Sequence, residues 1–131
     1  MQIKNIMITS VNFSVNIDFK SDEKTNFSFN VSVSSGNEKE NKLINAVVVV
    51  NTPTKEEAEN LPFYFSVTGR GIFSFSEDLT EKEFDLFQNI NCPAIVFPYI
   101  RELVADLTRR SSFPPLHLPP VNFAKMHKEK K

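Results

Sequence analysis

The sequence predicts an α+β protein, in which a four-stranded antiparallel β-sheet is followed by helices. Three observations support this class. The first two-thirds of the chain alternate apolar and polar residues, the predicted strands are joined by short links, and helical spacing replaces the alternation after about residue 80. The 131 residues are about the length of one ordinary domain, so we expect a single domain over 1–131.

The first two strand segments show one apolar face each. VNFSVNIDF (11–19) alternates strictly, which indicates a strand with one buried side. Ile6 and Ile8 lie in the opposite phase, so we expect a bulge near Thr9. NFSFNVSVS (26–34) repeats the alternation after a polar loop, and it predicts the second strand.

The next two segments complete the predicted sheet. LINAVVVVN (43–51) is rich in β-branched residues and suits a strand covered on both faces. FYFSVTGRGIFSFS (63–76) alternates again, and Gly69 and Gly71 interrupt it as a kink or bulge would. Four consecutive strands with short links favour an antiparallel meander.

Helical signals follow the strands. Thr80 and Glu83 have the spacing of a capping box and predict a short helix, which we expect NCP (91–93) to end. Apolar residues three and four apart predict a longer helix over 97–110. A last short helix is expected to begin near Val121.

Composition limits the classes of function. The net charge of −1 predicts no nucleic-acid partner, and no run approaches the ~20 apolar residues of a membrane span, so we expect no direct membrane insertion. The N-terminus has no signal-peptide pattern, so a cytoplasmic location is expected. The lysine-rich end, 124–131, has two interpretations: a solvated, frayed tail, or a contact with an acidic partner or RNA.

The reactive side chains form no recognisable catalytic pattern. One cysteine, Cys92, and two histidines, His117 and His127, have neither the spacing of a zinc site nor that of a nucleophile and its base. No phosphate-binding or dinucleotide-binding motif occurs. We therefore expect no enzyme, no cofactor and no metal.

The supply of apolar residues is large for so small a fold. The thirteen phenylalanines, together with a strand segment (43–51) that suits cover on both faces, exceed what one sheet and one long helix can bury. We therefore expect oligomerisation or a ligand to bury the surplus. The segment SFPPLHLPPVNF (112–123) combines four prolines with large apolar side chains, and it predicts an ordered, extended connector.

The C-terminal half resembles the bacterial export chaperone family SecB. The resemblance rests on GRGIFSFS (69–76) and on CPAIVFPYIRELVADLTRRSSFPPLHLPPVNF (92–123). The family carries a G-G-I-F segment, then C-P-x-x-x-F-P-Y-x-R-E, a helix, and F-P-x-L-x-L-x-P-V-N-F. The match extends over about residues 63–123 in the same order and at the same spacing.

This resemblance implies a SecB-like fold, a homotetramer built as a dimer of dimers, and a function. SecB-like proteins hold unfolded or precursor polypeptides without ATP, and they deliver many of them to the motor SecA. The family's acidic position in the strand before G-G-I-F is Ser66 here, and the C-terminal extension is a short lysine-rich tail. The resemblance therefore supports client binding more directly than it supports delivery of clients to SecA. The alternative is a dedicated SecB-like chaperone of an antitoxin in a toxin–antitoxin–chaperone system.

The resemblance and the apolar patterns together suggest site residues. For client binding we expect Phe63, Phe65, Tyr99, Phe113, Leu116, Leu118, Phe123 and Met126. For the subunit interface or core we expect Val67, Ile100, Val104 and Leu107. Packing at a subunit interface is an equally open interpretation for Phe65.

Overall fold

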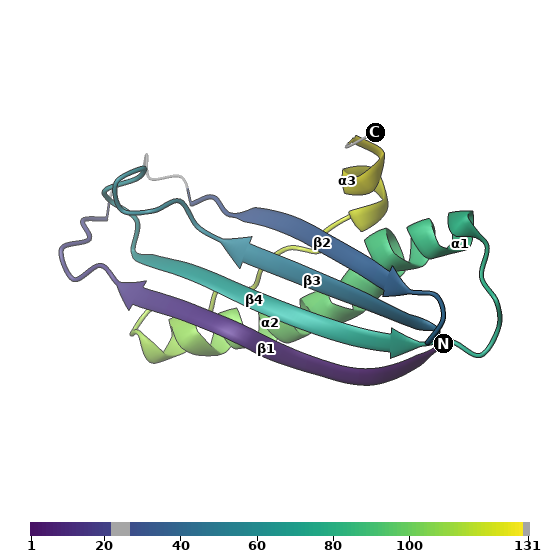
Figure 1. Cartoon of the computed structure of the whole chain (residues 1–131). Coiled ribbons are helices and arrows are strands. Elements are labelled where there is room, and N and C mark those ends of the chain that lie inside the picture. The colour runs from purple at the N-terminus through teal and green to yellow at the C-terminus, as the bar shows by residue number, and fades with distance from the viewer. Residues whose placement is uncertain (22–26, 130–131) are drawn as a thin grey trace.

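The computed structural model describes residues 1–21 and 27–129, in which a four-stranded antiparallel sheet has helices on one of its faces (Figure 1). The strands are β1 (Gln2–Val15), β2 (Asn30–Glu38), β3 (Leu43–Asn51) and β4 (Phe63–Ser74). The helical elements are α1 (Glu81–Leu86), the π turn η1 (Phe87–Asn91), α2 (Cys92–Arg110) and α3 (Phe123–Glu129). The predicted α+β class is confirmed. Most of the predicted polar loop before β2, residues 22–26, lies outside the described residues.

The order of the strands differs from the predicted meander. The sheet has the order β1-β4-β3-β2, so β1 pairs with β4 instead of β2. β1 is long enough to pair with β4 over its whole length, and this register places apolar residues opposite each other, as in Phe13 opposite Phe65 and Val15 opposite Phe63. The observed pairing thus gives apolar cross-strand contacts between β1 and β4.

The predicted bulge in β1 is confirmed, whereas the kink at the glycines of β4 is not. The register of β1 against β4 shifts between Ile8 and Ser10, and β4 itself runs without interruption through Gly69 and Gly71. The two glycines instead allow close packing. A Cβ on Gly71 would lie 2.7 Å from a methyl group of Val96 on α2, so a larger residue would push the helix off the sheet.

The helix side of the sheet is its buried face. In β3, the alternate residues Ile44, Ala46, Val48 and Val50 are fully buried. Val47 and Val49 point to the opposite face, where they are half-buried, so among the described residues the helices cover one face of β3 and leave the other more accessible. β2 begins at Asn30, later than predicted, and Phe27 therefore lies in the segment before the strand.

The helices after the sheet begin as predicted but are not broken at NCP. Thr80 and Glu83 form both hydrogen bonds of the capping box. The backbone then stays helical through η1, where the Cys92 N–H donates to the carbonyl of Phe87, five residues earlier. The wider π turn accommodates Pro93, which has no N–H to donate. As a result, α2 begins at Cys92 instead of residue 97.

The C-terminal segment is more ordered than a frayed tail. α3 begins at Phe123, and the Asn122 side chain accepts a hydrogen bond from the Lys125 N–H at 2.9 Å, as a helix cap does. The interpretation of 124–131 as a frayed tail is therefore wrong up to Glu129, and Lys130 and Lys131 lie outside the described residues.

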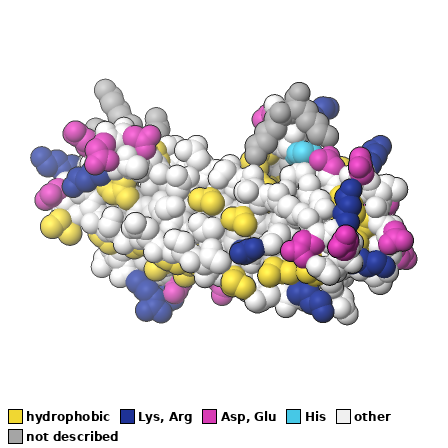
Figure 2. Space-filling view, viewed as in Figure 1, with side chains coloured by type: hydrophobic (Ala, Val, Ile, Leu, Met, Phe, Trp, Pro, Cys, Tyr) yellow, Lys and Arg dark blue, Asp and Glu magenta, His cyan; other side chains and the backbone are white. Residues whose placement is uncertain are grey.

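The other face of the sheet, which we call the open face, is not covered by any helix of the described part of the chain (Figure 1). On β4 it presents Tyr64, Ser66, Thr68 and Arg70. Figure 2 shows this side of the molecule with charged side chains gathered toward its two ends and few between them. None of the helices in the described part of the chain is long and apolar enough to cross a membrane.

Candidate polypeptide-binding site

Six phenylalanines from distant parts of the chain form one aromatic cluster on the helix side of the sheet. Phe63 is its centre, with ring centroids 5.8 Å from Phe13, 5.3 Å from Phe27 and 5.7 Å from Phe113. We call this group the phenylalanine cluster; its members are Phe13, Phe19, Phe27, Phe63, Phe65 and Phe113. Edge-to-face and tilted pairs of this kind add stability beyond the buried area itself.

The cluster has a buried floor and an accessible rim. Phe63 and Phe65, at the start of β4, are buried, whereas the other four rings are half-buried. Apolar side chains continue outward from the rim: Val15 is 41% exposed and Ile17 is 91% exposed. The cluster therefore presents aromatic surface that the described residues, 1–21 and 27–129, do not cover.

Hydrogen bonds hold the segment that carries Phe19. The Asn16 side chain, which is buried, donates to the carbonyl of Leu61 at 2.9 Å, and the Asn16 N–H donates to the carbonyl of Pro62 at 2.9 Å. These contacts tie the end of β1 to the loop before β4. They place the Phe19 ring at 6.0 Å from Phe113, in an edge-on contact between the end of β1 and the segment that follows α2.

The connector (residues 111–122) is attached to the end of α2 through one buried hydroxyl group. Thr108 is fully buried, and its Oγ1 donates to the carbonyl of Val104 at 2.9 Å. The same oxygen accepts the Leu116 N–H at 2.8 Å. Ser112 has a φ of 69°, a left-handed conformation that turns the chain away from the helix. Together these features direct Phe113 toward the cluster.

The Thr108 contact leads to a testable expectation. Thr108→Val keeps the shape of the side chain but removes the acceptor, and the part-buried Leu116 N–H loses its partner. We expect the free energy of unfolding to fall by about 1 kcal/mol, with faster hydrogen exchange at Leu116. Both quantities can be measured by urea unfolding and exchange mass spectrometry. Unchanged exchange in the connector would show that Thr108 does not hold it.

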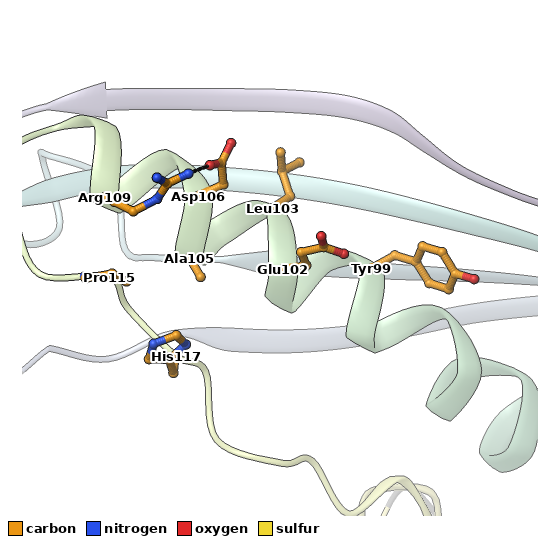
Figure 3. Close-up of a pocket in the computed structure, with 8 residues that line it drawn as sticks. All are labelled: Tyr99, Glu102, Leu103, Ala105, Asp106, Arg109, Pro115 and His117. Atoms are coloured by element: carbon orange, nitrogen blue, oxygen red, sulfur yellow. Dashed lines mark hydrogen bonds and ion pairs between the residues drawn. The ribbon is translucent and has the colours of Figure 1, made fainter.

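A second concave surface lies between α2 and the connector (Figure 3). This helix groove has a volume of about 530 Å³ and contains charged as well as apolar groups. One wall comes from α2, while Pro115 and His117 of the connector form the other. Tyr99, 48% exposed, lies at one end of the groove, and its ring points away from the charged pair at the other end (Figure 3).

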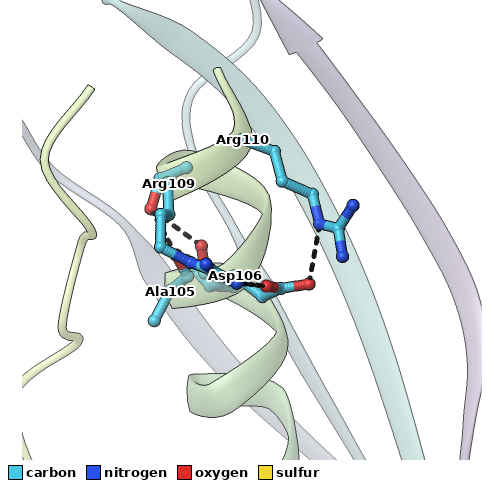
Figure 4. A network of polar contacts seen from close by, with 6 residues as sticks. Ala105, Asp106, Arg109 and Arg110 are labelled. Atoms are coloured by element: carbon cyan, nitrogen blue, oxygen red, sulfur yellow. Dashed lines mark hydrogen bonds and ion pairs between the residues drawn. The ribbon is translucent and has the colours of Figure 1, made fainter. Parts of the chain in front are cut away.

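That charged end is a small network on the last turns of α2 (Figure 4). Asp106 accepts hydrogen bonds from Arg109 and, at 3.0 Å, from Arg110. These two guanidinium groups, Arg109 first, hold the pKa of Asp106 below its ordinary value. The carboxylate therefore stays ionised near neutral pH, and the two arginines also complement the negative end of the helix dipole.

The predicted site residues lie in several different places. Phe63, Phe65 and Phe113 belong to the phenylalanine cluster, and Tyr99 lines the helix groove. Leu118 and Phe123 are buried in the core of this chain, whereas Leu116 and Met126 are half-buried against it. Of the residues expected at an interface or in the core, Val67, Ile100 and Val104 lie in the core and Leu107 is half-buried.

Sequence reasoning did not identify three members of the cluster: Phe13, Phe19 and Phe27. The alternation in VNFSVNIDF placed Phe13 and Phe19 on the apolar face of a strand, which was a usable signal. It could not connect them to Phe113, because the contact depends on β1 pairing with β4.

The described residues offer no clear reactive centre. Burial raises the pKa of the Cys92 thiol to about 12, so the nucleophilic thiolate is scarce at neutral pH. Within 1–21 and 27–129, no three or more His, Cys, Asp or Glu side chains are grouped as they would be to hold a metal ion. The arrangement is suited to contacts by apolar area.

These features define a class of protein: a helix-backed α+β sheet that leaves aromatic surface uncovered at one end. The model of the family described as preprotein translocase subunit SecB matches residues 1–131. The chain therefore belongs to the SecB family, and the resemblance seen in its C-terminal half extends to the whole chain.

Individual relatives agree with this assignment. The chain is 38% identical over 98 residues to the protein-export protein SecB of Neisseria meningitidis. The matched region covers 74% of this chain and 66% of that protein. It is 30% identical over 128 residues to an uncharacterized protein of Methanocaldococcus jannaschii, covering 96% and 81% of the two chains. The chain thus spans slightly less than two-thirds of the Neisseria relative.

A solved structure shows the same fold. It is the SecB-like chaperone of Mycobacterium tuberculosis in complex with a ChAD peptide from the HigA1 antitoxin. The TM-score is 0.74 at 20% identity, and the match covers 92% of this chain and 89% of the other. The similarity confirms the expected SecB-like arrangement of sheet and helices.

Proposed function

We propose that this chain is an ATP-independent chaperone that holds unfolded or precursor polypeptides, most directly for protein export. The observation that carries the proposal is the phenylalanine cluster, with its buried floor and uncovered rim, in a chain of the SecB family. Aromatic rings bind by area and tolerate many sequences, as an unfolded client requires.

The geometry suits an extended client. Phe63 and Phe65 form the floor of the site, and Phe113 of the connector forms one wall. Burying one large apolar side chain is worth roughly 1.5–3 kcal/mol, so several such contacts along a client give useful affinity without a fixed sequence. Tyr99 and the helix groove extend the surface along α2, and Leu116 and Met126 extend it along the connector and α3.

Oligomerisation is part of the proposal. Ile3 and Val11 lie on the helix side of the edge strand β1 and are 53% and 47% exposed. Together with the half-buried side chains of Val47 and Val49 on the open face, they leave apolar surface that a partner subunit could cover. We propose a homotetramer built as a dimer of dimers, with a mass near four times the 15.0 kDa chain.

Two different partners, the motor SecA or an antitoxin client, are compatible with the same binding site. SecA is one proposed partner, although the open face carries Ser66 where the family has an acidic residue. A dedicated antitoxin client is the second candidate, and it is consistent with the antitoxin peptide bound in the structure of the Mycobacterium relative. The neighbouring genes distinguish them, because adjacent toxin and antitoxin genes would support the second.

The holdase function predicts suppression of aggregation without nucleotide. A chemically denatured, unrelated protein is diluted into the assembled chaperone and its light scattering is followed. We expect the scattering to be suppressed at stoichiometric amounts. If the denatured protein still aggregates in an excess of the assembled chaperone, the chain is not a general holdase. The proposal of a dedicated client would then be the one that remains.

Variants at the proposed site sharpen this test. Phe113→Ala should weaken client binding by about tenfold, the equivalent of ~1.4 kcal/mol and close to the burial of one large side chain. Tyr99→Ala should weaken it less, at unchanged assembly mass. Leu86→Ala is the matched control, because Leu86 is 42% exposed on α1, outside the cluster and the groove. Equal losses in all three variants would argue against a localised site.

A further inference from the structure

α3 is held against the rest of the chain by few contacts, one of which contains a histidine. The helix has seven residues and packs against η1. The Phe123 ring lies edge-on to Phe97 of α2 at 5.8 Å, and Met126 is half-buried. His127 Nε2 lies 3.0 Å from Asp85 Oδ2 of α1. A helix this short is not stable alone, so docking decides whether it forms.

The histidine belongs to a chain of polar contacts that joins four elements, α3, α1, η1 and β2. Asp85 also accepts the Asn89 side-chain amide at 3.2 Å, and the Asn89 oxygen accepts the Ser35 hydroxyl from β2 at 2.8 Å. The His127 side chain is only 16% exposed and Asp85 35%. The contact is therefore shielded from solvent more than an ordinary surface pair, and its strength depends on charge.

We propose that His127 and Asp85 form a pH-sensitive latch that fastens α3 onto η1. The imidazolium attracts the carboxylate more strongly than the neutral imidazole does, because charge-assisted hydrogen bonds are roughly twice as strong as neutral ones. Protonation of His127 and docking of α3 therefore favour each other. Histidine side chains change charge between about pH 5 and 8, where Asp side chains are ordinarily ionised. Docking is tightest at the acidic end of this window and weakens as the pH rises.

The other described charged residues of α1 and α3 do not form a shielded pair like that of His127 and Asp85. On α1, Glu81 pairs with Lys39 at 3.6 Å and Glu83 is engaged by Thr80, while Lys82 is exposed. The charged residues of α3 other than His127 are exposed: Lys125, Lys128 and Glu129. η1 carries no titratable side chain. Exposed charges act through a screened medium, so we expect the shielded pair to contribute more to the response to pH than any one of these exposed groups.

Opening the latch has a consequence for the apolar surface. Release of α3 removes the ring of Phe123 from Phe97 and uncovers both. The pH would therefore change the area of exposed apolar surface beside the connector. This consequence rests on the proposed client binding, whereas the latch itself is a property of the free protein.

The latch can be tested without a client. Hydrogen exchange of the α3 amides, such as the Met126 N–H that donates to the Asn122 carbonyl, is measured in the assembled protein at about pH 5.5 and about pH 7.5. Relative to His127→Gln at the same pH, we expect the wild-type protein to be protected roughly fivefold more at the lower pH and much less at the higher pH. Taking the ratio at each pH cancels the intrinsic pH dependence of exchange.

Two controls make the result specific. The chain has two histidines, so His117→Gln removes the other one and should leave the pH effect on α3 intact. Asp85→Asn should abolish the pH effect as His127→Gln does. A protection ratio between the wild type and His127→Gln that is the same at both pH values would overturn the latch. So would a ratio that loses its pH dependence when His117→Gln takes the place of the wild type. Either outcome leaves the aggregation assay, and with it the proposed chaperone function, unaffected.

Discussion

Phe63→Ala is expected to lower the free energy of unfolding by about 3–5 kcal/mol, the largest effect of any substitution considered for this chain. Phe63 is buried and contacts the rings of Phe13, Phe27 and Phe113. Its removal leaves a cavity that these rings, held by three different segments, cannot all fill. Urea unfolding at fixed protein concentration measures the change, since oligomerisation makes apparent stability depend on concentration.

The same position offers its own control. Phe63→Leu keeps most of the volume and should cost less than about 1.5 kcal/mol. The half-buried Phe29, outside the cluster, should tolerate Phe29→Ala at about 1 kcal/mol. If Phe63→Ala were no more damaging than Phe29→Ala, the cluster would not be the structural centre of this end of the molecule.

Gly71→Ala is expected to be the second most damaging of these substitutions, with a loss of about 1–3 kcal/mol from overpacking. The added Cβ would lie 2.6 Å from the Phe73 ring and 2.7 Å from a Val96 methyl group. Both neighbours are fully buried, so little free space is left for them to move into. Thermal or urea unfolding of the variant measures the loss.

Gly36 provides the matched control for this substitution. It also lies in a strand, β2, but a Cβ there would meet nothing within 4 Å. Gly36→Ala should leave stability unchanged or raise it by about 0.5–1 kcal/mol, because alanine loses less backbone entropy on folding. Equal destabilisation by both substitutions would indicate a general cost of alanine in these strands instead of contact with α2.

Several features of the fold followed from local sequence signals. The bounds of β3 agree with the segment 43–51, the bulge near Thr9 was visible as a change of phase, and Thr80 and Glu83 form the predicted capping box. Each signal involves residues close in sequence, whose geometry depends on local periodicity and hydrogen bonding. The SecB family was recognisable from motifs in the C-terminal half, and the family match over the whole chain confirms it.

The site was only partly predictable, because its contacts are not local. Phe113 was expected to bind clients, but its neighbours Phe19 and Phe63 are distant from it in the sequence. The glycines of β4 seemed to mark a kink, since spacing alone does not show which helix will cross them. The proline in NCP seemed to end a helix, because the π turn before it has no distinct local pattern.

The sequence by itself therefore determined the class of fold, the approximate positions of the strands and helices, and the family, because these depend on periodic patterns and ordered motifs. It misplaced the starts of β2 and α2. The tertiary structure alone decided which strands pair, why β4 needs glycine beneath α2, and which phenylalanines meet. It also brought His127 to Asp85 across 42 positions of the chain. Such contacts depend on how the whole chain folds to bury its apolar surface. They cannot be predicted from any short segment of the sequence.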